Sequence, residues 1–188
     1  MSVLDALFGK DVRHSPGLSE AGAGSTETET VRKITEALDQ LEPERARYIA
    51  CYAYLLGRVA HADLEISDEE TRAMERIVVE RGQLPEEQAI IVVQMAKTQN
   101  RLFGGTEDFL VTREFNEVAT REQKLALLDC LFAVSASDQG ISTVEANEIS
   151  KIAKAIHLSH EDLVQMRTAY QEYLNVLKKP PGSAAPTE

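Results

Sequence analysis

The strongest constraint on the fold is a short acidic pattern that occurs twice, 75 residues apart, as "ADLEISDEE" at residues 62–70 and "SDQGISTVE" at residues 137–145. Six positions match at this separation: Val59 with Val134, Asp63 with Asp138, Ile66 with Ile141, Ser67 with Ser142, Glu70 with Glu145, and Ile77 with Ile152. In each copy an apolar helical pattern ends at the Asp, and the Ser opens the next helix. Repetition at a fixed period indicates an internal duplication. We expect two helix-loop-helix units related by a pseudo-twofold axis, with their loops as neighbours.

The apolar residues recur with the 3.6-residue period of helices, and no alternating run is long enough to predict a strand. Apolar spacing, N-cap residues and breakers place eight helices, at about residues 31–41, 48–61, 68–81, 85–99, 107–118, 121–137, 143–156 and 160–177. Five of them follow residues that open or cap a helix, namely Ser67 with Glu70, Thr106, Thr120 with Gln123, Ser142 with Glu145, and Ser159. The helix at 121–137 is apolar on nearly all faces, so we expect it at the centre.

These patterns predict an all-α fold, a single-domain helical bundle of about seven or eight helices built from two pseudo-symmetric helix-loop-helix repeats. Apolar residues make up 43% of the chain, which is enough for one buried core. The predicted domain spans residues 31–178. Residues 1–30, rich in Gly, Ser, Thr and Glu, read as a flexible amino-terminal tail and linker, and residues 179–188 as a disordered carboxy-terminal tail.

The charge balance indicates which classes of partner suit the chain. The chain carries 31 acidic and 20 basic residues, a net charge of −11, so its field repels nucleic acid and anionic lipid. Basic partners and divalent cations fit this field, although an acidic surface also serves solubility alone. The sequence contains no secretory signal and no apolar stretch of transmembrane length, which predicts a cytoplasmic protein. Cys51 and Cys130 lie in apolar runs without further ligands at zinc spacing, and are expected to be buried thiols.

The acidic loops are not complete EF-hands. With Glu145 as the last ligand of such a loop, Asp138 falls at position 5 and Ser142 at position 9, but positions 1 and 3 are Val134 and Ala136. The first copy fails in the same way, and neither copy has the Gly that the loop requires at position 6. Calcium binding therefore requires that both loops share one ion.

Two interpretations of the loops remain open. In the structural one, the Ser-x-x-Glu pattern is a capping box, and Asp63 and Asp138 cap loop amides in Asx turns. In the functional one, a divalent metal ion, with calcium favoured, is bound by the paired loops. Its predicted ligands are Asp63, Glu70, Asp138 and Glu145, with Glu65, Asp68 and backbone carbonyls near Gly140 as possible additions.

Over about residues 45–177, the pair "VAHADLEISDEE" and "VSASDQGISTVE" resembles the repeated acidic motif of the tellurite-resistance TerB family. This family is similar in fold to the amino-terminal domain of the DnaJ-like co-chaperone DjlA. The resemblance implies an all-helical bundle with pseudo-twofold symmetry, an acidic face and a place in the bacterial cytoplasm. It also implies a divalent metal site, which carries over here to Asp63, Glu70, Asp138 and Glu145 alone.

The chain departs from the family pattern in two places. Family members commonly have Asp-Gly after the apolar helix, whereas Leu64 and Gln139 stand at these positions here, so each turn must form without Gly there. The second copy is also less acidic, because Thr143 and Val144 stand where the first has Asp68 and Glu69. The His-Pro-Asp motif of J-domains is absent from the sequence, so the likeness to DjlA does not imply stimulation of a chaperone ATPase.

No catalytic constellation stands out, and we predict no catalytic residues and no enzyme. The histidines lie in the linker or near predicted helix ends, and "LFGGTED" lacks the P-loop pattern. Two hypotheses remain: a metal-responsive or stress-response protein with shared acidic loops, and an interaction or adaptor module that is co-chaperone-like. The second presents its acidic face, or the apolar turn "VLDALF" at residues 3–8, to an unknown protein partner. A homodimer is a further possibility.

Overall fold

The computed structural model describes residues 23–60, 68–102, 108–137 and 140–174. Its helices are α2 (Ala23–Asp39), α3 (Pro43–Ala60), α4 (Asp68–Glu80), α5 (Glu86–Leu102), α6 (Asp108–Val118), α7 (Arg121–Ala136), α8 (Thr143–Ala155), α9 (His160–Ala169) and the 3₁₀ turn η2 (Gln171–Tyr173). The described residues include no strand beyond one isolated bridge, so the all-α prediction is confirmed. Within these ranges, no helix has the combination of length and apolar character that a membrane span requires.

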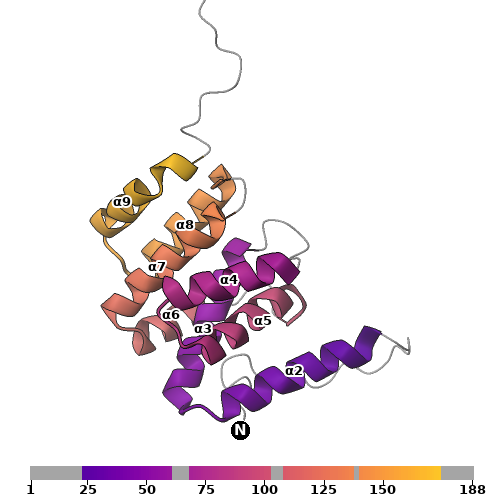
Figure 1. Cartoon of the computed structure of the whole chain (residues 1–188). Coiled ribbons are helices and arrows are strands. Elements are labelled where there is room, and N and C mark those ends of the chain that lie inside the picture. Colours follow the sequence, from indigo (N-terminus) through magenta and orange to yellow (C-terminus); the bar gives the residue numbers. More distant parts are fainter. Residues whose placement is uncertain (1–22, 61–67, 103–107, 138–139, 175–188) are drawn as a thin grey trace, which may run out of the picture.

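Helix α3 lies at the centre of the bundle, between two groups of helices (Figure 1). Twelve of its residues are buried, and it contacts α2, α5, α6, α7 and α8. On the α6 side, the Tyr48 ring stacks on Phe115 with 5.6 Å between ring centroids. The sequence pointed to α7 as the central helix. That helix is buried on most of its faces, but α3 contacts more of the bundle.

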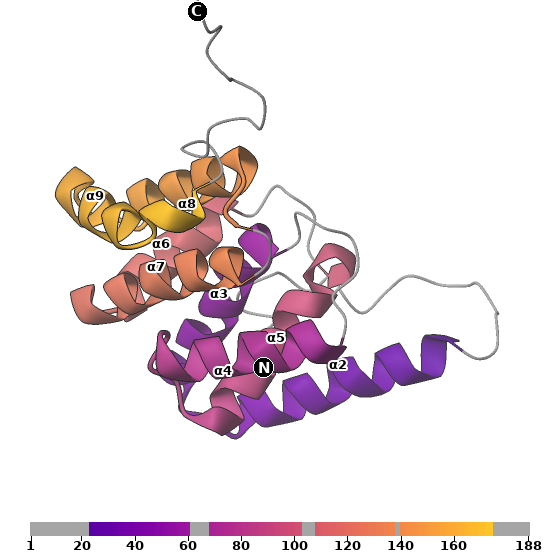
Figure 2. The same cartoon turned by 45° about the horizontal axis from the view of Figure 1, so that its top comes forward.

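The remaining helices divide into two groups around α3 and α6. Helices α2, α4 and α5 lie on one side and α7, α8 and α9 on the other, with contacts between α4 and α7 (Figure 2). Helix α4 begins at Asp68 and ends at Glu80, and α8 begins and ends 75 residues later, at Thr143 and Ala155. These bounds agree with the repeat separation. The duplication and its pseudo-twofold axis stay predictions, because helix bounds alone do not establish them.

Helix α2 begins at Ala23, eight residues before Val31, the predicted start of the domain. Glu29 pairs with Lys33 one turn later, with 2.9 Å between the carboxylate and the ammonium group. Such pairs, together with Ala and Glu, allow a helix to continue beyond its buried face. Residues 1–22 of the predicted tail at residues 1–30 lie outside the described residues, and residues 23–30 are the start of α2.

The last helix is shorter than predicted. Helix α9 ends at Ala169, and the chain then turns so that the Ile141 amide donates to the Tyr173 carbonyl at 2.7 Å. Leu174 forms a parallel bridge with Ile141, and both side chains are buried. A continuing helix would carry Leu174 away from this contact, so tertiary pairing overrides the helical period.

Both cysteines are free and buried, as predicted. Burial raises the pKa of Cys51 and of Cys130 to about 12. Their thiols therefore stay protonated at neutral pH and act as small apolar core groups.

Gly82, in the turn after α4, makes room for the hydroxyl of Tyr52. A Cβ at this position would clash with that hydroxyl oxygen and would lie 2.5 Å from the Val78 carbonyl oxygen. We predict that Gly82→Ala lowers the free energy of unfolding by about 1–3 kcal/mol, because the core must shift to accept the methyl group. Chemical denaturation of the parent and the variant measures this change in the free energy of unfolding. Arg81→Ala, an exposed neighbouring change, should stay within about 0.5 kcal/mol of the parent. Equal losses in the two variants would contradict the prediction.

Candidate functional site

Glu145 closes a capping box at the start of α8, as the sequence predicted. The Ser142 hydroxyl accepts from the Glu145 amide at 3.2 Å, and the Ser142 amide donates to Glu145 Oε2 at 2.8 Å. The same arrangement holds at α7 with Thr120 and Gln123, and at α9 with Ser159 and Asp162. The capping box is therefore a sufficient reason for Glu145 at this position, and no bound metal is needed to explain it.

The second acidic loop returns to the bundle through Gly140 and Ile141. Gly140 has a φ of 108°, a backbone conformation that glycine adopts readily. The chain thus has its glycine one residue later than the Asp-Gly pattern places it. Ile141 is buried and held by the carbonyl of Tyr173. The carboxy-terminal segment therefore anchors this loop, which the sequence did not indicate.

Two of the four predicted metal ligands can be placed. Glu70 is exposed in the first turn of α4, beside Asp68 and Glu69, and Glu145 is partly buried in α8. Asp63 and Asp138 lie outside the described residues, so the separation of the two loops stays a prediction. Among the described residues alone, no three His, Cys, Asp or Glu side chains are grouped to hold a metal ion.

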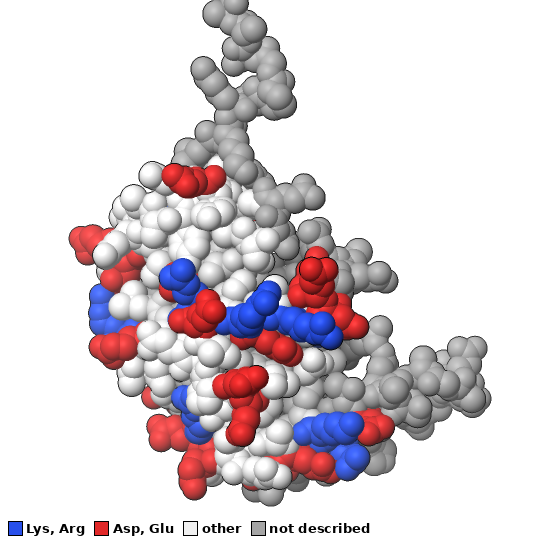
Figure 3. Space-filling model, viewed as in Figure 1, with Lys and Arg blue, Asp and Glu red and all other residues white. Residues whose placement is uncertain are grey.

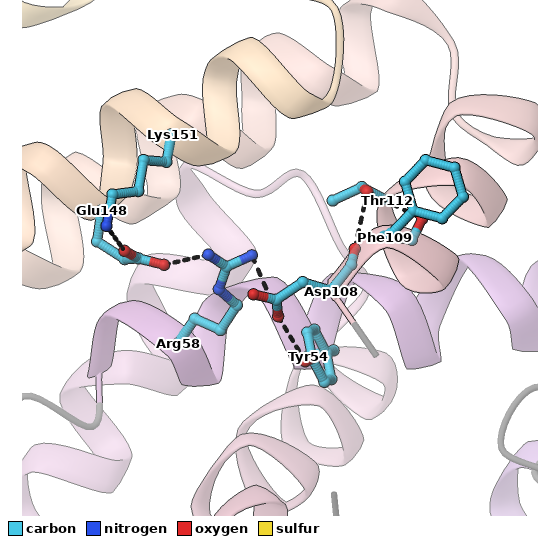
Figure 4. A network of polar contacts seen from close by, with 7 residues as sticks. All are labelled: Tyr54, Arg58, Asp108, Phe109, Thr112, Glu148 and Lys151. Atoms are coloured by element: carbon cyan, nitrogen blue, oxygen red, sulfur yellow. Dashed lines mark hydrogen bonds and ion pairs between the residues drawn. The ribbon is translucent and has the colours of Figure 1, made fainter. Parts of the chain in front are cut away.

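An arginine that the sequence analysis did not single out links three helices (Figure 4). Arg58, in the last turn of α3, forms an ion pair with Glu148 of α8 through Nη2. Its Nη1 lies 3.4 Å from Oδ1 of Asp108, at the start of α6. Only 17% of the Arg58 side chain is exposed, so the charge is largely withdrawn from water. An arginine so placed requires partners, and here it has two carboxylates.

Further contacts hold the two carboxylates and the start of α6 in position. The Tyr54 hydroxyl donates to Asp108 Oδ1 at 2.6 Å, and Lys151 lies 3.3 Å from Glu148 Oε2. The Thr112 hydroxyl donates to the Asp108 carbonyl at 2.8 Å, one turn back along α6. The only sequence signal for this cluster was one arginine in the apolar stretch of α3, because its partners are 50 and 90 residues away.

This cluster brings the end of α3, which precedes the first loop, against α8, which follows the second loop. The first loop leaves α3 two residues after Arg58, and Glu148 lies three residues after Glu145. The Arg58–Glu148 pair therefore holds the start of the first loop against the helix that follows the second. Figure 3 shows acidic and basic side chains interleaved on the face that carries α4.

We predict that Arg58→Met lowers the free energy of unfolding by about 1–2 kcal/mol, because it leaves Asp108 without its cation and Glu148 with only the exposed Lys151. Arg32→Met is the matched control. Its pair with Glu36 is exposed and lies within one helix, so its loss should cost at most about 0.5 kcal/mol. Adding Glu148→Gln to Arg58→Met should cost less than the same change in the parent. Additive losses in urea denaturation would show that the pair is not coupled.

Comparison with known proteins gives one family match. Residues 48–168 match the family model described as tellurite resistance protein TerB, from within α3 to within α9. No curated protein and no solved structure matches the chain. The matched region covers more than half of the 188 residues and includes both acidic motifs. The chain therefore belongs to the TerB family, as the paired motifs indicated.

Proposed function

We propose that the protein is a non-enzymatic stress-response member of the TerB family in the bacterial cytoplasm. In this proposal it binds a divalent cation, and calcium is the favoured ion. The proposed ligands are the carboxylates of Asp63, Glu70, Asp138 and Glu145. The observation that supports the proposal is the ion pair between Arg58 and Glu148, because it holds the start of the first loop against the helix after the second.

The chemistry of the described groups is compatible with this site. Calcium takes about six to eight oxygen ligands, more than one loop can supply. Glu145 uses Oε2 for its cap, and its Oε1 accepts no hydrogen bond from the described residues. Arg58 does not oppose a cation strongly, since its charge is already balanced by Asp108 and Glu148. Glu145 can thus cap α8 and ligate at the same time.

Calcium titration of the ¹⁵N-labelled protein, followed through amide chemical shifts, tests the proposal. With calcium raised to about 5 mM, above the dissociation constants of weak protein sites, we expect changes confined to residues 61–70 and 138–145. Glu145→Gln keeps a capping oxygen but removes the charge, and should weaken binding by about tenfold or more.

Asp162→Asn is the matched control for Glu145→Gln. Asp162 occupies the same capping position in α9, outside the paired loops, and should leave calcium affinity unchanged. Absence of any localised shift at millimolar calcium overturns the cation proposal. Equal weakening by both variants would show that helix capping, rather than ligation, is what the titration reports.

A second candidate is an interaction module in which the acidic loops serve only as helix caps. It is favoured by the reciprocal hydrogen bonds of Ser142 and Glu145, which the protein completes by itself. The same box at Ser159 and Asp162 operates where no metal is proposed. In this candidate the partner-binding element is the acidic first turn of α4 or the apolar turn at residues 3–8.

Removal of residues 1–22 tests the second candidate without cutting α2, which begins at Ala23. We expect the truncated chain to lose a partner captured from bacterial lysate, while its melting temperature stays nearly unchanged. The pair Leu7→Asp with Phe8→Asp should have the same effect, since it removes the apolar surface. Ser2→Asp with Ser15→Asp adds equal charge and should retain the partner. Loss with all three variants alike would reject a specific apolar contact.

A further inference from the structure

Helices α4 and α5 form a shallow groove on the outer face of the bundle, with a volume of about 390 Å³. Its apolar part is Val79 and Ile90, whose side chains are exposed at 36% and 42%. The two helices run antiparallel through the turn at residues 81–85, and the Lys97 ammonium donates to the Thr71 hydroxyl at 2.7 Å. This pairing sets Ile90 at the level of Val79, so the two form one apolar centre.

The charges of the groove are separated along its axis. Arg72 and Arg76 line the groove on the amino-terminal side of Val79. Glu80 and Glu86 line the groove on the opposite side of Val79. Glu75 lies between the arginines, so the first half carries two positive charges and one negative, a net +1, and the second carries −2. Figure 3 shows this mixture of signs on the face that carries α4.

These charges have no ion-pair partners in the part of the chain that the structure describes. None of the five forms an ion pair with a residue in the described parts of the chain, whereas Arg58, Arg81, Arg121 and Lys151 all do. Four of the five side chains are exposed, and Glu75 is partly so. An exposed apolar centre with unpaired charges of opposite sign on either side is typical of a contact surface.

We propose that this groove is the interface of a homodimer, with α4 of one subunit antiparallel to α4 of the other. A twofold axis that passes through Val79 and Ile90 places the apolar centre of one subunit against the apolar centre of the other. The same rotation turns each basic half onto the partner's acidic half, so Arg76 meets Glu80 and Glu86 of the second subunit. A surface that complements itself in this way satisfies the symmetry requirement of an isologous dimer.

The size of the surface sets the strength of the contact. Two apolar side chains per subunit and a few exposed ion pairs make an interface at the small end, where association is weak and transient. We therefore expect a dissociation constant in the high micromolar range, and weaker association as salt rises and screens the ion pairs.

Sedimentation analysis of the full chain, from about 10 μM to about 1 mM, tests the proposal with a charge exchange. Arg76→Glu and Glu80→Arg should each weaken self-association by about tenfold, because each sets like charges against one another. The double variant restores the pairing and should recover dimerisation. A mixture of the two single variants should form heterodimers more readily than either forms homodimers.

Glu80→Arg separates a direct contact from general repulsion. It adds two positive charges to a net charge of −11, giving −9, so simple repulsion predicts stronger association. The interface predicts weaker association. Val79→Asp should abolish the dimer, while Val164→Asp, on α9, changes an exposed valine away from the groove and should preserve it.

Two outcomes overturn the proposal. One is a chain that stays monomeric up to about 1 mM at low salt. This result rejects the homodimer in each of three cases: the groove is empty, residues 1–22 occupy it, or another protein binds there. The other is self-association that is as strong in the two single charge variants as in the parent, which would place the contact on another face.

Discussion

Burial of α3 on nearly all its sides is the constraint on which the rest of the structure depends. A helix with twelve buried residues requires neighbours in every direction, and α2, α5, α6, α7 and α8 supply them. This arrangement divides the bundle into two groups, and it brings the end of α3 against a helix from the second half of the chain. If the acidic loops are neighbours, as predicted, this packing rather than attraction between them must bring them together, since like charges repel.

Arg58 is a charged residue at the end of this buried helix. The last turn of α3 is too enclosed for an unpaired guanidinium, so the chain places Asp108 and Glu148 around it. The cluster ties α3 to α6 and α8 next to the two motifs, and Tyr54 and Lys151 complete it. The ends of α3 and α6 and the helix α8 therefore form a support whose charges are neutralised by one another. Membership of the TerB family agrees with the helical framework, whereas cation binding and partner binding rest on the chemistry of individual residues.

Local chemistry in the sequence predicted most of the helices and the three caps that the described residues include. The capping boxes at Thr120, Ser142 and Ser159 follow from residues three positions apart, and all three are present. Long-range contacts were not predictable in this way. The helical stripe through Tyr173 and Leu174 predicted a longer last helix, but Leu174 pairs with Ile141 instead. Arg58 was passed over because neither of its partners is near it in the chain.

The sequence by itself determined the helical class, the positions of most helices, the family, and the candidate ligands Asp63, Glu70, Asp138 and Glu145, because these follow from periodicity, capping and a repeated motif. Only the tertiary structure decided that α3 is central, that the carboxy-terminal segment holds Ile141, and that Arg58 links α3 to α8. It also decided that the charges of the α4–α5 groove are left without ion-pair partners among the residues that the structure describes. The physical reason is that packing and ion pairing depend on distance in space, which residues many turns apart acquire only when the core has formed.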